Sequence, residues 1–311
     1  MPAIAVSGLV FDYAARRALH DVGFAIEPAT ITALVGPNGA GKTTLLKCLA
    51  GLQRPLAGTV AVAGIDVLAE PRAAHRAIGL LPDFYGLYDA LTVDRCLRYF
   101  AAAHGVTPAE RPERIARTAR ALGIEDRLGQ RARALSRGLR QRLAIAQAII
   151  HDPPVLLLDE PAAGLDPDAR AALAALLRGL RTDGKTILVS SHILSELEDY
   201  STHMLILREG RVVDHAPIGA AAVAREARHL RLRLADPTPA LATILATLDG
   251  VGAVMTADGG TTAEFSFVGD ARAQHALLRA VLDAGLPVVA FEEVRRSMQD
   301  IYLDHVHARA P

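Results

Sequence analysis

One glycine-rich stretch constrains the fold of this chain more than any other part of the sequence. It runs from Gly36 to Thr44, and its residues 36–43 match the pattern Gly-x-x-x-x-Gly-Lys-Thr. The apolar residues 31–35 precede it and fit a strand buried on both faces. Leu45, Leu46 and Leu49 follow at the spacing of one helix face. The stretch therefore predicts a strand, a phosphate-binding loop and a helix in succession, rather than a glycine-rich turn that matches by accident.

The residue types in this loop suit a polyphosphate. Glycine has no side chain, so backbone N–H groups can wrap around phosphates, and the following helix adds the positive end of its dipole. Lys42 would bring a full charge to the β- and γ-phosphates, and the hydroxyl of Thr43 would reach Mg²⁺. The predicted nucleotide-binding residues of the loop are Gly36, Pro37, Asn38, Gly39, Ala40, Gly41, Lys42, Thr43 and Thr44.

Composition narrows the class of protein. The 311 residues include 34 Lys and Arg against 34 Asp and Glu, so the formal net charge is zero and no basic field points to nucleic acid. Cys48 and Cys96 form neither a disulfide framework nor a metal motif, which fits a reducing cytoplasm. The start of the chain lacks the pattern of a signal peptide, and no run approaches the roughly 18 apolar residues of a membrane span.

A second apolar strand ends in two adjacent carboxylates. Residues 155–158 are Val-Leu-Leu-Leu, and Asp159 and Glu160 follow at once. Two acids are costly at the end of a buried strand unless a metal or a water uses them, so we expect Asp159 to hold Mg²⁺ and Glu160 to polarise an attacking water. Residues 186–189 predict another core strand. His192, just beyond it, is a candidate partner of the γ-phosphate, although a single histidine is more often structural.

Four further positions have an ordinary interpretation as well as a functional one. Tyr13 precedes the P-loop strand and fits either a ring that stacks on a nucleobase or a core aromatic. Asp83 ends the apolar strand 77–82, where α/β sheets bind ligands, yet the pattern alone favours a solvated loop. Ser136 and Gly138 begin a long predicted helix and fit either an anion site or a simple N-cap.

Hydrophobic patterning predicts two domains. Residues 1–222 form an α/β domain, with an antiparallel layer that includes strands 4–10 and 22–26 and an inserted helical subdomain at about 84–150. Within this domain we also expect a turn at 64–66 and an alanine- and leucine-rich helix from 167 to about 180. Residues 223–311 show the order β-α-β-β-α-β of a small ferredoxin-like α+β domain, with a closing helix at 298–306 and without a catalytic constellation.

Together these motifs resemble the ATP-binding subunit of ABC transporters over about residues 3–220. The matching positions are Tyr13 at the adenine-stacking place, 36–44 as Walker A, 135–138 as the signature motif, 156–161 as Walker B, 164–166 as the D-loop and His192 as the H-loop. The stretches 81–92 and 135–142 and the additional C-terminal region resemble the ATPases of drug- and antibiotic-resistance exporters. Three positions depart from the family pattern: Asp83 replaces glutamine, Arg137 replaces glycine and Leu139 replaces glutamine.

The resemblance implies an ATPase with a P-loop NTPase core, an ABC-type antiparallel β layer and a helical subdomain, using ATP and Mg²⁺. The implied catalytic residues are Lys42, Glu160 and His192, the implied metal ligands are Thr43, Asp83 and Asp159, and the implied nucleotide contacts outside the loop are Tyr13, Ser136, Gly138 and Asp166. Two subunits would face head to tail, so that ATP on one meets the signature motif of the other.

The resemblance also implies partners and a location. A separate membrane-spanning subunit would dock its coupling helix in the groove between Asp83 and the helical subdomain, and the chain would lie on the cytoplasmic face of the cell membrane. A homodimer is expected because both halves of the composite site occur in one chain. The alternatives are a soluble ABC-type ATPase and an ATP-binding regulator. Neither the cargo nor a nucleic-acid partner is indicated.

Overall fold

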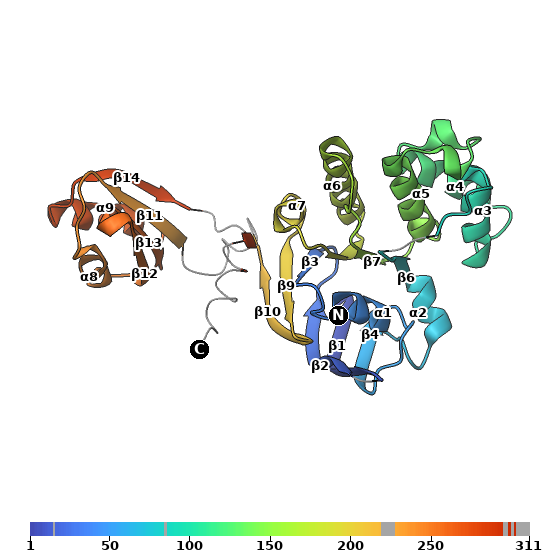
Figure 1. The fold of residues 1–311 in the computed structure, drawn as a ribbon, viewed down its shortest axis with the longest axis horizontal. Helices are drawn as coiled ribbons and strands as arrows, with labels where there is room; N and C mark the ends of the chain where they lie inside the picture. Colours follow the sequence, from blue (N-terminus) through green and yellow to red (C-terminus); the bar gives the residue numbers. More distant parts are fainter. Residues whose placement is uncertain (15, 84–85, 219–227, 295–297, 300–301, 303–311) are drawn as a thin grey trace. The chain divides into compact units, whose positions relative to one another are not determined.

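The computed structural model describes residues 1–14, 16–83, 86–218, 228–294, 298–299 and 302 (Figure 1). The chain forms two compact units, Met1–Pro217 and Ile218–Pro311. The domain boundary expected at residues 222 and 223 lies outside the described residues.

A six-stranded sheet in the order β10-β9-β3-β8-β7-β6 is the centre of the first unit. Its strands are β3 (Ile31–Val35), β6 (Ile78–Leu81), β7 (Val155–Asp159), β8 (Thr186–Ser190), β9 (His203–Arg208) and β10 (Arg211–Pro217). Neighbouring strands are parallel except for the β9–β10 hairpin. Strands β3, β7 and β8 are buried along their whole length, which explains why they are continuous apolar runs without alternation.

A second, antiparallel sheet has the order β2-β1-β4-β5. Its strands are β1 (Ile4–Tyr13), β2 (Arg16–Ile26), β4 (Ala57–Val62) and β5 (Ile65–Asp66). Strands β1 and β2 extend further than the sequence indicated, because they continue as a paired ribbon up to Tyr13 and Arg16. Residues 64–66 were expected to form a turn, but Ile65 and Asp66 pair with the end of β4.

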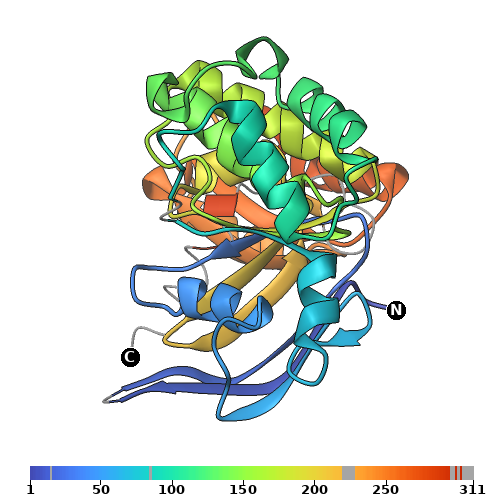
Figure 2. The same cartoon turned by 90° about the vertical axis from the view of Figure 1, so that its right-hand side faces the viewer.

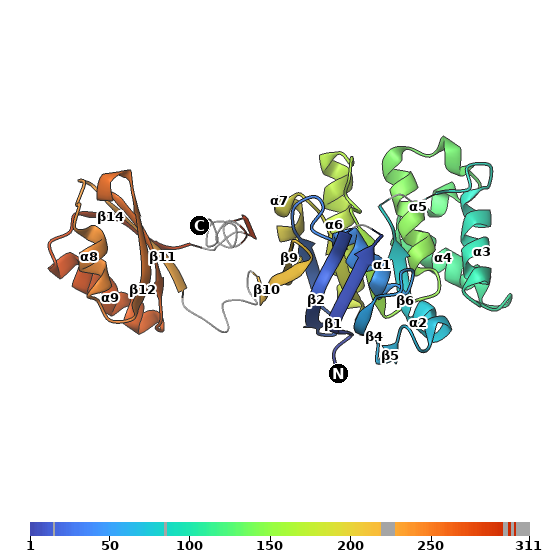
Figure 3. The same ribbon diagram turned by 60° about the horizontal axis from the view of Figure 1, so that its bottom comes forward.

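Helix α1 (Lys42–Leu49) fills the space between the two sheets (Figure 3). Its leucines Leu45, Leu46 and Leu49 are at most 1% exposed and pack in one core with residues of both sheets, among them Leu9 and Leu157. The apolar face expected for this helix is therefore confirmed, and burial on both sides holds the preceding loop in place.

Three helices form the expected inserted subdomain beyond β6 (Figures 1 and 2). They are α3 (Val93–Ala103), α4 (Arg111–Ala121) and α5 (Arg137–Ile149). Helix α3 begins at Thr92, whose Oγ1 accepts a hydrogen bond from the backbone N–H of Arg95 at 3.3 Å. Helix α6 (Pro167–Thr182) follows β7 as expected, whereas the short helices α2 (Pro71–Ala77) and α7 (Leu194–Glu198) lack a clear periodic signal in the sequence.

The second unit has the strand order β12-β13-β11-β14 of a ferredoxin-like sheet. Its elements are β11 (Arg228–Leu234), α8 (Leu241–Ala246), β12 (Val251–Ala257), β13 (Thr262–Phe267), α9 (Ala271–Asp283) and β14 (Val288–Glu293). The second unit has a hydrophobic core of its own, in which alternate residues of β11 and β13 pack with residues of α8 and α9. The two helices therefore cover one face of the sheet. The closing helix expected at 298–306 lies largely outside the described residues.

Among the described residues, no helix has the length and the apolar composition that crossing a membrane requires.

Replacement of Leu157 by alanine should lower the free energy of unfolding by about 2–5 kcal/mol, because Leu157 is completely buried in strand β7, which has a neighbouring strand on each side. Urea denaturation followed by circular dichroism measures this change. Leu52→Ala, at a position that is 59% exposed, is the matched control and should change stability by less than about 0.5 kcal/mol. Equal effects of the two substitutions would contradict the described core.

Candidate functional site

The phosphate-binding loop is packed directly against the backbone of neighbouring strands. A Cβ at Gly36 would overlap the carbonyl oxygen of Leu207 in β9. Gly41 has a φ of +107°, and a Cβ there would lie 2.9 Å from the carbonyl oxygen of Ala18 in β2. A side chain at Gly36 is excluded by contact, and one at Gly41 by contact and backbone conformation. The loop therefore has a fixed position between the two sheets.

The ammonium of Lys42 lies across this loop. Its Nζ donates hydrogen bonds to the carbonyl oxygens of Gly36 at 2.7 Å and Pro37 at 3.4 Å. The residue is 8% exposed. Burial lowers the pKa of Lys42, and the negative charges of Glu160 and Asp159 act in the opposite direction. An ammonium has three donors, so a buried cation with two carbonyl partners is suited to bind an anion with the third.

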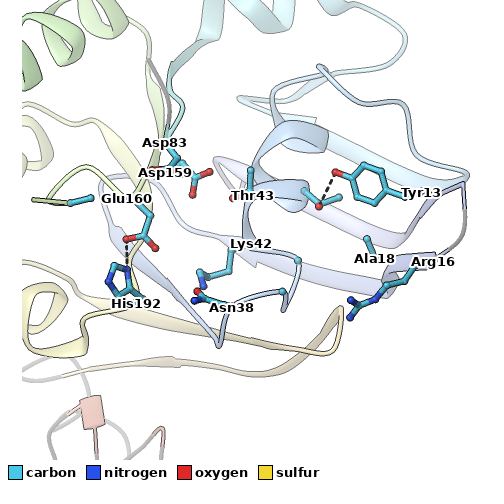
Figure 4. Close-up of a pocket in the computed structure, with 14 residues that line it drawn as sticks. Tyr13, Arg16, Ala18, Asn38, Lys42, Thr43, Asp83, Asp159, Glu160 and His192 are labelled. Carbon is cyan, nitrogen blue, oxygen red and sulfur yellow. Dashed lines mark hydrogen bonds and ion pairs between the residues drawn. The ribbon is translucent and has the colours of Figure 1, made fainter. Parts of the chain in front are cut away.

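The ends of β7 and β8 place the carboxylates and the histidine opposite the loop (Figure 4). Asp159 is buried and accepts a hydrogen bond from the hydroxyl of Ser190. The backbone N–H of Glu160 donates to the carbonyl oxygen of Ser190 at 3.1 Å. Oε2 of Glu160 lies 2.8 Å from Nδ1 of His192. The predicted Walker B acids and the predicted H-loop histidine thus meet at one edge of the sheet.

Glu160 has an unusual backbone conformation. Its φ is +50°, in the left-handed region that a residue with a Cβ rarely adopts. This conformation turns the chain sharply after Asp159, so the two adjacent acids have different surroundings: Asp159 is 4% exposed and Glu160 is half-buried. Strained backbone of this kind is found at functional sites, where the surrounding structure stabilises it.

These groups line a cavity of about 500 Å³ (Figure 4). The predicted residues that line it are Tyr13, Asn38, Gly39, Gly41, Lys42, Thr43, Thr44, Asp83, Asp159, Glu160 and His192. Arg16, Ala18 and Ala163 also line it, and the sequence did not single them out. Arg16 and Ala18 lie on the ribbon after Tyr13, and only the pairing of β1 with β2 brings them to the cavity.

The ring of Tyr13 is held at its hydroxyl. Oη lies 3.2 Å from Oγ1 of Thr44 and accepts a hydrogen bond from Nε2 of Gln53 at 3.2 Å. The hydrogen bond with Thr44, followed by that with Gln53, lowers the pKa of Tyr13. Phe11 packs edge-on against the ring with a centroid distance of 5.0 Å. Because Tyr13 is still 46% exposed, its fixed ring leaves surface for a planar ligand.

The residues expected to bind Mg²⁺ occur together in this cavity. Thr43, Asp83 and Asp159 supply one hydroxyl and two carboxylates, and hard oxygen ligands suit this ion. Within the described part of the chain, no group of three or more His, Cys, Asp or Glu side chains could hold a metal alone. An ion here would therefore need phosphate or water oxygens in addition to these three residues.

Ser136, Gly138 and Asp166 do not line this cavity. Ser136 caps helix α5, where its Oγ accepts from the N–H of Leu139 at 3.4 Å. Asp166 caps helix α6, where Oδ1 accepts from the N–H of Ala169 at 2.8 Å. The ordinary N-cap interpretation of Ser136 is thus correct for the single chain.

A second cavity, of about 340 Å³, lies between β6 and the helical subdomain. His104 and His151 stack in its wall with their ring centroids 3.8 Å apart. Nε2 of His151 lies 3.1 Å from the carbonyl oxygen of Ile78. Burial, and next the neighbouring His104, lowers the pKa of His151 to about 4. Burial also lowers the pKa of His104. The stacked pair His104 and His151 is therefore neutral at neutral pH.

Comparisons with known proteins agree with this geometry. A sequence model described as ABC transporter matches residues 19–163. The chain is 36% identical over 198 residues to the ABC transporter ATP-binding protein NatA of Bacillus subtilis, which covers 63% of this chain and 80% of the relative. It is 33% identical over 297 residues to the Nod factor export ATP-binding protein I of Paraburkholderia xenovorans, which covers 93% of this chain and 95% of the relative.

A solved structure described as an ATP-binding subunit of an ABC transporter has the same fold. The TM-score is 0.63 at 34% identity, and the match covers 69% of this chain and 90% of the other. The alignment with the Paraburkholderia protein is longer and includes most of the second unit.

His151 should make the stability of the first unit depend on pH. Burial lowers its pKa in the folded chain to about 4, below the ordinary histidine value of 6.5, so the unfolded chain binds the proton first as the pH falls. Stability is therefore fully present above about pH 6.5 and is lost as the pH falls toward 4. His151→Gln should reduce the stability difference between pH 7 and pH 5 in urea denaturation.

The matched control is His20→Gln, a half-buried histidine that does not line this groove. If the stability of His151→Gln depended on pH as strongly as that of the wild-type protein, this would contradict the assignment of the pH dependence to His151.

Proposed function

This chain belongs to the ABC transporter family as an ATP-binding subunit with ATPase activity, and we propose that it is the motor of an export system that acts through a separate membrane-spanning subunit. The observation that carries the proposal is the meeting of the P-loop, the Asp159–Glu160 pair and His192 around one cavity. Each group comes from the end of a different strand of the parallel sheet.

The geometry supports a specific division of roles in hydrolysis. Lys42 and the N–H groups at the start of α1 would bind the phosphates, and Tyr13 would stack on the adenine. Glu160 would accept a proton from the attacking water. His192 lies within hydrogen-bond distance of Glu160 and would hold that carboxylate while it contacts the γ-phosphate. Mg²⁺, held by Thr43, Asp83 and Asp159, would neutralise charge that develops on the phosphates.

The site would be completed by a second subunit. Ser136 and Gly138 lie outside the cavity of their own chain, at the N-terminal end of α5, where backbone N–H groups and the helix dipole favour an anion. Asp166 begins α6 in the same way. We propose a head-to-tail homodimer in which these residues contact the nucleotide bound by the other copy, since one chain carries both halves of the site.

The membrane-spanning partner would dock at the cavity between β6 and the helical subdomain. This cavity includes Pro82, which directly precedes Asp83 of the nucleotide site, so one short segment borders both places. Movement at either place would reach the other through this segment. A location on the cytoplasmic face of the membrane follows from the proposed role.

Export as the direction of transport is supported by the relatives. The Nod factor export ATP-binding protein I of Paraburkholderia xenovorans aligns with this chain over both units. We further propose that the subfamily is the drug- and antibiotic-resistance type, on the sequences 81–92 and 135–142. The membrane subunit would select the cargo.

Glu160→Gln should lower the rate of ATP hydrolysis by about 100-fold or more, because an amide cannot accept the proton of the attacking water. ATP binding should persist, so the variant should elute as a dimer on size exclusion in ATP. The control is Glu198→Gln, an exposed glutamate at the end of α7, which should hydrolyse at the wild-type rate. Undiminished hydrolysis by Glu160→Gln, or no ATP-dependent dimer, would exclude the proposed mechanism.

A further inference from the structure

The side chain of Arg137 connects two loops that are distant in sequence. It is the first residue of α5 and stands between Ser136 and Gly138. Its Nη2 donates a hydrogen bond to the carbonyl oxygen of Ala163 at 3.2 Å. The family pattern has glycine at position 137. The hydrogen bond to Ala163 therefore depends on the arginine side chain that departs from this pattern.

Gly164 accommodates this side chain. A Cβ at Gly164 would overlap the guanidinium of Arg137, so the guanidinium lies directly against the backbone of the loop. The φ of Gly164 is +68°, which also favours glycine. Contact and conformation together indicate that Arg137 and Gly164 fit each other, and that the arginine is not simply a solvated surface residue.

Ala163 connects Arg137 to the catalytic side of the molecule. Ala163 lines the nucleotide cavity, and its backbone N–H donates to the carbonyl oxygen of Glu160 at 3.1 Å. Glu160 in turn lies 2.8 Å from His192. A continuous path of hydrogen bonds therefore runs from Arg137 through Ala163 to the backbone of Glu160, whose φ of +50° has to be stabilised by its surroundings.

The strength of the first connection depends on its exposure to water. Arg137 and Gly164 are both exposed in the single chain. A charged hydrogen bond that competes with water contributes little, and the same bond is stronger when another molecule excludes water from it. Another molecule that buries the signature motif would therefore strengthen the hydrogen bond from Arg137 to the carbonyl oxygen of Ala163.

We propose that Arg137 is a positioning residue that couples contact at Ser136 and Gly138 to the placement of Glu160 in the same chain. The proposal rests on the proposed function, because the covering molecule is the second ATP-bound subunit. Engagement of the signature motif by one nucleotide would in this way prepare the hydrolytic site that holds the other.

Arg137→Ala should lower kcat for ATP hydrolysis about tenfold, the effect of one charged hydrogen bond in a water-excluded site. KM for ATP should change less than about twofold, because Arg137 does not line the cavity. Arg137→Lys, which keeps a donor of the same charge, should recover part of the rate. Arg133→Ala, on the exposed turn that precedes the signature motif, is the matched control and should leave both constants unchanged.

A double-mutant cycle tests the contact itself. Gly164→Ala should slow hydrolysis more in the wild-type background than in Arg137→Ala, because only the wild-type side chain meets the added Cβ. The conformational strain at φ +68° is common to both backgrounds and cancels. Strict additivity of the two substitutions would overturn the proposal.

Hydrogen exchange gives a readout that does not need hydrolysis. The backbone amides of residues 163–166 should exchange faster in Arg137→Ala than in the wild-type protein, and Arg133→Ala should match the wild type. Unchanged exchange, or a kcat within twofold of the wild-type value, would overturn the role of Arg137 while the Glu160→Gln result would still support the motor. Absence of hydrolysis by the wild-type protein would instead reject the proposed function.

Discussion

The close approach of the phosphate-binding loop to the strands on either side of it is the contact on which the site depends. Gly36 lies against the backbone of β9 and Gly41 against the backbone of β2, so the loop is held by both sheets at once. Helix α1 extends from this loop into the core that the sheets share. The apolar core therefore determines where the N–H groups of the loop and the ammonium of Lys42 point.

Parallel strand direction brings the remaining groups together. Strands β3, β6, β7 and β8 all run the same way, so the residues that follow them emerge at one edge of the sheet. Asp83, the Asp159–Glu160 pair and His192 are far apart in sequence and meet there for this reason alone. The left-handed conformation of Glu160 then separates two neighbouring carboxylates, one buried against Ser190 and one directed to His192.

The nucleotide cavity and the signature motif are separate places on one chain. This separation is the reason for proposing a dimer in which the signature motif of one copy contacts the nucleotide of the other. Ser136 and Gly138 begin a helix of the inserted subdomain, whereas the cavity lies at the edge of the six-stranded sheet. Arg137 connects the two through Ala163. The arginine that departs from the family pattern at position 137 thus has a defined contact within the chain.

The sequence by itself determined the P-loop, the strands that precede Glu160 and His192, the inserted helices and the element order of the second unit, because each depends on local spacing or on long apolar runs. It did not indicate the role of Arg16 or Ala163, nor the contact between Arg137 and Gly164. Those features depend on the pairing of β1 with β2 and on the approach of two loops. Only the tertiary structure decides them, because pairing register and side-chain contacts between distant segments leave no periodic pattern in a single sequence.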